Sequence, residues 1–250
     1  MVGPPGCRAL FVALPALAKQ TRADLVVANG ENAAEGLGLT PEIAGSLFQS
    51  GVDVITSGNH IWQRREILSL LETDGRILRP ENYPLGVPGK GHLLLNRRQT
   101  PVAVVNLQGL QHLPSIRCPF ATGAELVRKL RGRTKIIIVD FHAESLEEKE
   151  ALALHLDGQV SAVIGTHTHV QTADERVLPG GCAYLGDAGM TGPREGVIGM
   201  KREVSIRRSL TQIPIKMEVD ASEPLIMGAL VEIDAAGGKA LTIQRICQEP

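Results

Sequence analysis

The sequence predicts an α/β fold whose central strands are covered on both faces, and three observations lead to this prediction. Short, nearly continuous runs of β-branched residues recur along the first two thirds of the chain, which is typical of buried strands. Segments with helical spacing separate these runs, which favours a layered arrangement of helices and strands. The last third instead holds two alternating segments around a Gly-Gly turn, which indicates an antiparallel hairpin.

Five apolar segments are the predicted strands of the first two thirds, and they alternate with four segments of helical pattern. Two of the helices carry clear start signals. Thr40 and Pro41 open the first, and Ser145 with Glu148 forms a capping box for the last. The strands are predicted at residues 24–28, 52–56, 102–107, 135–139 and 160–164, and the helices at 41–49, 64–71, 123–130 and 147–156.

The two ends of the chain are less regular. Gly-Pro-Pro-Gly at residues 3–6 is typical of a loop, and a helix-like stretch follows it. We expect two stacked sheets with helices outside them, and the absence of a linker indicates one domain spanning residues 1–250. Near the C-terminus, strands are predicted at 216–219, 227–233 and 240–246, with the hairpin turn at 235–238.

The composition fits an ordinary globular protein and argues against several function classes. The 250 residues are 43% hydrophobic and 21% charged, and the net charge is −1. This charge gives no strong nucleic-acid footprint. No apolar run reaches the roughly 18 residues of a membrane span, so no membrane association is expected. The cysteines form no CxxC pair, which fits a reducing, cytoplasmic location.

Polar side chains of the types that bind metals follow four of the predicted strands. In a layered α/β fold the carboxyl ends of the strands gather at one edge, so these four loops are expected to converge on one cleft. The segments are Asn-Gly-Glu-Asn at 29–32, Gly-Asn-His at 58–60, Asp-Phe-His at 140–142 and Gly-Thr-His-Thr-His at 165–169.

The Gly-Thr-His-Thr-His segment gives the strongest single signal. His167 and His169 are two residues apart, so on extended backbone both imidazoles project to the same side and can reach one metal or a close pair. The alternative is a threonine-rich strand with two incidental histidines. His142, which follows another apolar strand, favours the metal site. Imidazole and carboxylate ligands suit zinc, manganese or iron.

Two further pairs of polar residues have competing interpretations. The Asn59 side-chain oxygen can bind a metal while His60 acts beside it as a general acid, but Asn59 is also a good helix N-cap. Glu31 and Asn32 can likewise be metal ligands, or exposed and capping residues at the end of a strand. Taken alone, each pair fits the structural interpretation better.

Seven longer segments occur in order along nearly the whole chain. They are NGENAAEGLGLT (29–40), GVDVITSGNHIW (51–62), RPENYPLGVPGKG (79–91), VVNLQG (104–109), VDFHAES (139–145), SAVIGTHTHVQTAD (161–174) and DAGMTGPREGVIGM (187–200). Together they resemble the YmdB-like bacterial branch of the calcineurin-like metallophosphoesterase family. This resemblance implies a four-layer α/β/β/α sandwich of the metallophosphoesterase type. It also implies two bound metal ions (Fe, Mn or Zn) and hydrolysis of phosphodiesters, with cyclic nucleotides as a substrate class.

The resemblance also assigns roles to individual residues. Six side chains are assigned to the metal ions and one to proton transfer. The bridging ligand would be Glu31, the first site would be completed by Asn32 and His169, the second would be formed by Asn59, His142 and His167, and the general acid would be His60.

One part of the family pattern falls before the first residue of this sequence. Val2 and Gly3 match the end of the motif that follows the family's first strand, so that strand and its metal-binding Asp would precede Met1. Either the true start lies upstream of Met1 and restores the ligand, or the chain lacks this strand and has a weaker first site. The loss of a core strand would consume much of a stability margin of about 5–15 kcal/mol, which favours the upstream start.

Three functions remain after these observations. The leading one is a dinuclear metal-dependent phosphodiesterase, in which a metal-activated water attacks and His60 protonates the leaving group. The alternatives are a regulatory or nucleotide-sensing metal-binding protein with weak or no turnover, and a protein with one structural metal. For the phosphodiesterase and for the nucleotide-sensing protein, the partner is a small phosphodiester or nucleotide. The segment at 187–200 is expected to form either the rim of the site or an interface of a homo-oligomer.

Overall fold

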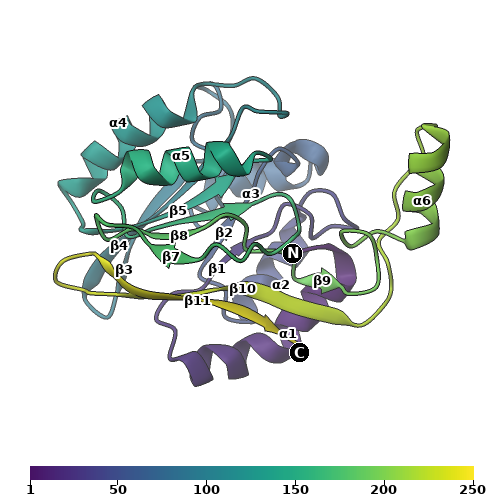
Figure 1. The fold of residues 1–250 in the computed structure, drawn as a ribbon, viewed down its shortest axis with the longest axis horizontal. Coiled ribbons are helices and arrows are strands. Elements are labelled where there is room, and N and C mark those ends of the chain that lie inside the picture. The colour runs from purple at the N-terminus through teal and green to yellow at the C-terminus, as the bar shows by residue number, and fades with distance from the viewer.

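The chain folds around a six-stranded mixed sheet, in a computed structural model that describes residues 1–250 (Figure 1). Four parallel strands form the centre of this sheet, and an antiparallel strand closes each edge. Helices alternate with the parallel strands, which confirms the predicted α/β fold. In spatial order the strands are β3 (His92–Arg97), β4 (Thr100–Gln108), β5 (Ile136–His142), β6 (Ala162–Thr166), β8 (Ala183–Leu185) and β7 (Arg176–Val177).

The central strands are apolar along most of their length because both faces of the sheet are buried. In β4, Val105 and Leu107 belong to the core that the sheet shares with the helices above it. Val104 points to the opposite face and packs with Val54 and Leu78. Two-sided burial explains why these strands lack the polar–apolar alternation of a sheet with one solvated face.

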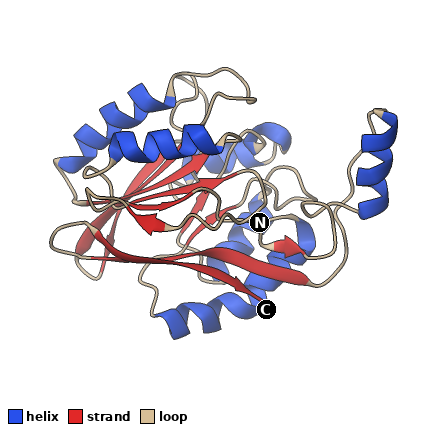
Figure 2. Cartoon of the chain, in the orientation of Figure 1, coloured by secondary structure: helices blue, strands red, loops and turns tan.

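Helices α4 (Pro119–Arg131) and α5 (Leu146–Leu156) lie side by side over one face of this sheet (Figure 2). Helix α5 begins at the predicted N-cap, because Ser145 Oγ accepts a hydrogen bond from the Glu148 N–H at 3.2 Å. Apolar side chains of both helices complete the core beneath them. The helices therefore cover the sheet face that points away from the N-terminal part of the chain.

The N-terminal part of the chain forms the other side of the molecule. A parallel two-stranded sheet packs there with helices around it, and Leu10, Leu47 and Ile55 belong to its core. A 3-10 turn precedes the third helix, which therefore starts later than predicted. The elements are α1 (Gly3–Thr21), β1 (Val27–Asn29), α2 (Pro41–Gln49), β2 (Val54–Thr56), η1 (Ile61–Gln63) and α3 (Ile67–Thr73).

The predicted C-terminal hairpin is present as β10 (Pro224–Ile233) and β11 (Ala240–Gln248). Strand β10 also pairs with the short strand β9 (Gly192–Pro193) and contacts α1. Strand β11 contacts β7 and β8 of the large sheet. The hairpin therefore lies between α1 and the six-stranded sheet (Figure 1).

Two local predictions are wrong. Gly-Pro-Pro-Gly is not a loop but the first turn of α1. Proline is tolerated there because the first N–H groups of a helix have no partner within the helix. Residues 216–219 form no strand, and only Val219 makes an isolated bridge, with Met200. Helix α6 (Arg202–Thr211) precedes this segment and projects away from the rest of the chain (Figure 2).

Two further observations concern the chain as a whole. No helix combines the length and the apolar character that crossing a lipid bilayer requires. All four cysteines are free, so no disulfide stabilises the fold.

Candidate metal centre

The four polar segments meet where the strands of two sheets end. Glu31 lies just beyond β1, and Asn59 just beyond β2. His142 is the last residue of β5, and His167 directly follows β6. The structure thus brings together side chains from four loops or strand ends that are far apart in the sequence.

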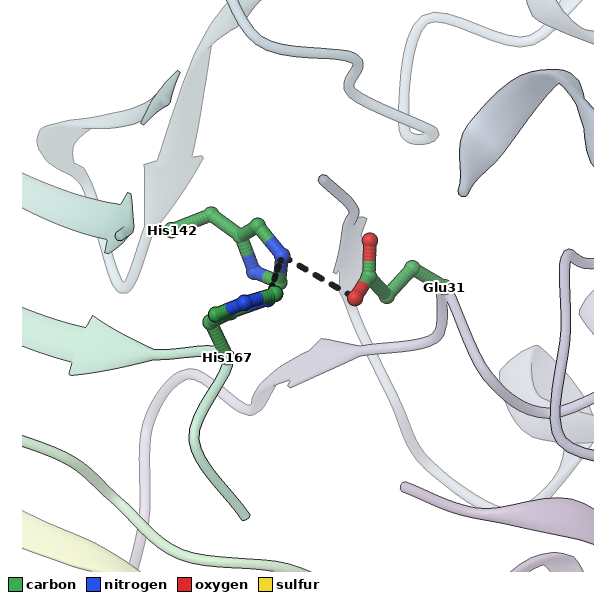
Figure 3. Close-up of side chains that lie close together, drawn as sticks. All are labelled: Glu31, His142 and His167. Carbon is green, nitrogen blue, oxygen red and sulfur yellow. Dashed lines mark hydrogen bonds and ion pairs between the residues drawn. The ribbon is translucent and has the colours of Figure 1, made fainter. Parts of the chain in front are cut away.

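Glu31, His142 and His167 form the centre of this cluster (Figure 3). The Nε2 atom of His142 lies 3.0 Å from Glu31 Oε1 and 3.0 Å from His167 Nδ1. Asn59 Oδ1 lies 3.0 Å from the same His142 nitrogen. One carboxylate oxygen, one amide oxygen and two imidazole nitrogens therefore converge on a small volume.

The other predicted site residues lie beside Glu31 and bond to one another. Asn32 Nδ2 lies 2.9 Å from His169 Nε2 and 3.4 Å from Glu31 Oε1. Asn32 Oδ1 lies 2.8 Å from His60 Nδ1, and the His60 backbone N–H donates to Glu31 Oε2 at 3.2 Å. Asn32 therefore presents its amide nitrogen, not its oxygen, to His169.

The backbone of the Thr-His-Thr-His segment differs from the predicted extended strand. The φ angle is 111° at His167 and 65° at His169, in the left-handed region that residues with side chains rarely adopt. Asp187 stabilises this turn, because its Oδ2 accepts a hydrogen bond from the Thr168 N–H at 3.0 Å. The prediction that extended backbone presents both imidazoles to the same side is therefore wrong, and the two rings contact different neighbours.

The segment at 187–200 borders this site. His169 Nδ1 donates to the carbonyl oxygen of Ile198 at 3.0 Å. Asp187, at the start of the segment, holds the loop that carries the two imidazoles. Parts of this segment therefore lie at the rim of the site, as one of its two interpretations predicted.

Burial and neighbouring charges set the protonation of the cluster. Burial by itself raises the pKa of Glu31, but the nearby His142 and His60 outweigh it and lower that pKa to about 2. Burial, and then the neighbouring His142, lower the pKa of His167 to about 4. At neutral pH Glu31 is therefore a carboxylate and His167 a neutral imidazole, which are the forms that bind metal ions.

The residues present fit a divalent metal ion. Gly58 leaves room for the cluster, because a Cβ atom there would collide with the His142 ring and the Glu31 carboxylate. The ligand atoms of Glu31, His142 and His167 lie within 4.8 Å of one another. Carboxylate and imidazole groups are ligands for zinc, manganese and iron. These three residues therefore form a candidate metal site.

Three polar residues behind the imidazoles had no role assigned to them from the sequence: Asp140, Thr166 and Glu144. His142 Nδ1 lies 3.0 Å from Thr166 Oγ1, which donates to Asp140, and His167 Nε2 lies 3.0 Å from Glu144 Oε2. Asp140 lies two residues before His142 on β5 and so on the same face, a signal that identifies it in retrospect. Glu144 lies in a loop, where spacing carries no comparable signal.

Comparison with known proteins identifies relatives along the whole chain. Residues 1–246 match the family described as YmdB-like protein. A Bacillus subtilis (strain 168) protein named 2′,3′-cyclic-nucleotide 2′-phosphodiesterase is 44% identical over 246 residues, which are 98% of this chain and 93% of that protein.

Two crystal structures share the fold. A hypothetical protein from Thermus thermophilus has a TM-score of 0.94 and 37% identity, covering 100% of this chain and 96% of its own. A novel phosphatase from Mycoplasma pneumoniae has a TM-score of 0.92 and 33% identity, covering 99% of this chain and 91% of its own.

The α/β fold is shared with these relatives, and the strand ends of this chain hold a carboxylate–imidazole cluster. Together with relatives that are named a phosphodiesterase and a phosphatase, these observations define the class of a hydrolytic phosphoesterase. The chain belongs to the YmdB-like family, as the seven segments of the sequence predicted.

Proposed function

We propose that this phosphoesterase is a metal-dependent phosphodiesterase with two metal ions, and that cyclic nucleotides are its substrate class. The observation that carries the proposal is the convergence of Glu31, Asn59 and His167 within 3.0 Å of one imidazole nitrogen of His142. The 44% identical relative named 2′,3′-cyclic-nucleotide 2′-phosphodiesterase supports the substrate class.

Six side chains would hold the metal ions, and Fe, Mn and Zn suit their mixture of oxygen and nitrogen donors. When bound, two such ions neutralise an anionic phosphodiester and lower the pKa of the attacking water. For Asn32 to bind through oxygen on the His169 side, its amide would turn, because Nδ2 faces that imidazole. Glu31 would be shared by both ions. The first site would be completed by Asn32 and His169, and the second would be formed by Asn59, His142 and His167.

We assign proton transfer to the leaving oxygen to His60. Its Nδ1 contacts the Asn32 amide at 2.8 Å, which leaves Nε2 for the substrate. Burial lowers the pKa of His60, although the Glu31 carboxylate opposes this shift. A lower pKa makes the imidazolium a stronger acid toward the departing oxygen.

We also propose how the helices and sheets are layered. Helices α4 and α5 cover one face of the large sheet, the hairpin β10–β11 lies against its other side, and α1 covers the hairpin. This succession supports the four-layer α/β/β/α sandwich, built as one domain over residues 1–250. The free cysteines fit a cytoplasmic location.

Protein loaded with Mn, Fe or Zn tests this function. We expect two ions per chain and turnover of both bis-(p-nitrophenyl) phosphate and 2′,3′-cyclic AMP, with a large loss of 2′,3′-cyclic AMP turnover in His60→Ala. The absence of turnover in the loaded protein would overturn the proposal, and unchanged turnover of 2′,3′-cyclic AMP in His60→Ala would overturn the role of His60. Tight nucleotide binding without product would instead favour a nucleotide-sensing protein. One ion per chain, with no nucleotide binding, would favour a structural metal.

A further inference from the structure

A buried carboxylate, that of Asp140, lies behind the His142 imidazole, with the Thr166 hydroxyl between them. Asp140 is 6% exposed, and its carboxylate accepts three hydrogen bonds. The donors are Thr56 Oγ1, Thr166 Oγ1 at 2.7 Å and Asn29 Nδ2 at 3.1 Å. The roles proposed for the metal ligands and for His60 leave this carboxylate without a function.

The hydrogen bonds determine which nitrogen of His142 carries the hydrogen. Thr166 has one hydroxyl hydrogen, and it is donated to Asp140 Oδ1. The Thr166 oxygen can then only accept from His142 Nδ1, which lies 3.0 Å away. Nδ1 must therefore be the protonated nitrogen of the neutral ring. The lone pair is left on Nε2, the atom that faces Glu31 and Asn59.

This arrangement opposes a competing tautomer. Glu31 Oε1 and Asn59 Oδ1 both lie 3.0 Å from His142 Nε2, and both are acceptors. Without a partner at Nδ1, these two oxygens would favour a hydrogen on Nε2, and that nitrogen could then not bind a metal. A hydroxyl whose hydrogen is committed to a buried carboxylate provides the opposing acceptor.

The strand register explains why the three groups are in contact. His142 of β5 is paired with Thr166 of β6, so their side chains are direct neighbours on the same face. Asp140 precedes His142 by two residues on that face. The contact therefore depends on two adjacent rigid strands and not on a mobile loop.

We infer that Asp140 and Thr166 are positioning residues that hold His142 in the Nδ1–H tautomer and aim Nε2 at the metal. The inference rests on the proposed function only in that Nε2 serves as a metal ligand. The other two imidazoles differ, since His167 Nε2 faces the half-exposed Glu144 and His169 Nδ1 faces a backbone carbonyl. Removal of such an outer hydrogen bond typically weakens metal affinity by about 10–100-fold.

The first test is the tautomer itself. Nitrogen-15 spectra of the metal-free protein at about pH 9, above the ordinary histidine pKa of about 6.5, should show His142 as the Nδ1–H form. Thr166→Val should shift it toward Nε2–H, and Thr166→Ser, which keeps the hydroxyl, should not. Thr168→Val is the matched control, because its hydroxyl contacts only the neighbouring backbone. An Nε2–H form in the wild type would overturn the inference.

The second test is metal affinity. Zn²⁺ should bind Thr166→Val about 10–100-fold more weakly than the wild type, Thr166→Ser or Thr168→Val. Equal affinity of Thr166→Val and the wild type would overturn the inference. If the wild type bound no metal, the proposed function would fail. The metal-free spectra would still show which nitrogen of His142 carries the hydrogen. Those spectra also cover the case in which Thr166→Val does not fold, because the wild-type tautomer is measured directly.

Discussion

Lys149 Nζ lies 2.8 Å from Asp187 Oδ2, and neither side chain has any exposed surface. Lys149 belongs to α5, in the helical layer. Asp187 also accepts the Thr168 N–H, between the two imidazoles of the candidate metal centre. This buried ion pair therefore connects the helical layer to the loop that carries His167 and His169.

Lys149→Met should destabilise the protein by about 3–5 kcal/mol, because it leaves the buried Asp187 carboxylate without its cation. Urea unfolding measures the loss. Lys129→Met is the matched control, since Lys129 pairs with Glu125 on an exposed helical surface at 2.7 Å and should change stability by less than about 1 kcal/mol. A similar small change for both variants would contradict the role of the buried pair.

Gly58→Ala should abolish or strongly weaken metal binding. The added methyl group would overlap the His142 ring and the Glu31 carboxylate, and both of these side chains are buried. Metal analysis after dialysis measures the effect. Gly45→Ala is the control, because nothing lies within 4 Å of a Cβ there and α2 should gain about 0.5–1 kcal/mol in stability. Full metal content in Gly58→Ala would contradict the geometry of the site.

His60→Gln should separate proton transfer from metal binding. Loss of a general acid costs about 10²–10⁴ in rate when the leaving oxygen needs a proton. The loss should therefore be large with 2′,3′-cyclic AMP and much smaller with bis-(p-nitrophenyl) phosphate, whose leaving group is stable as an anion. Metal content should not change. An equal loss with both substrates would exclude His60 as the acid.

Chelation should lower the melting temperature. A ligand at about 100 times its Kd stabilises the folded state by about 2.7 kcal/mol, which corresponds to roughly 5–10 °C for a protein of this size. Differential scanning calorimetry with and without EDTA measures the shift. In His142→Asn, which lacks the central ligand, EDTA should have little effect. A wild-type melting temperature that does not change with EDTA would contradict a metal bound in the folded protein.

Glu81→Gln should reduce stability at neutral pH but not in acid. Glu81 Oε2 accepts the Gly91 N–H at 3.0 Å and lies 3.1 Å from His92 Nδ1. Burial raises the pKa of Glu81, but His92 and Arg79 outweigh it, so the net shift is downward. With a folded-state pKa below the unfolded value of about 4.3, the carboxylate stabilises the fold above that pH. This stabilisation is lost as the pH falls through the folded-state pKa.

At pH 7, Glu81→Gln should lower the free energy of unfolding by about 1–3 kcal/mol, because hydrogen bonds to a charged group are lost. Urea unfolding from about pH 7 down to about pH 3 follows the disappearance of this difference. Glu232→Gln is the control, because Glu232 is exposed in β10 and forms no ion pair. A stability difference between the wild type and Glu81→Gln that increased as the pH fell would contradict this mechanism.

The order of helices and strands was predictable because its signals are local. Thr40 opens α2 as expected, with its Oγ1 accepting the Ile43 N–H at 3.4 Å. The first strand begins later than predicted, at Val27, because the Val26 N–H donates to the Asp53 carboxylate at 2.8 Å. Residues 216–219 alternate like a strand but pair only at one end, where Val219 bridges Met200 and the Glu218 carbonyl oxygen accepts from the Lys201 N–H. A strand requires a neighbour along its length to satisfy its backbone groups.

By itself, the sequence determined the α/β alternation, the loops that carry ligand-type side chains and the family to which the chain belongs. Each of these properties depends on residues that are close together in the sequence. Only the tertiary structure decided which atoms face one another. The contact of His142 with Glu31, the left-handed backbone at His167 and the hydrogen bond from Thr166 to Asp140 join or depend on distant segments. They arise from how the strands pair and how the sheets pack, so no single segment encodes them.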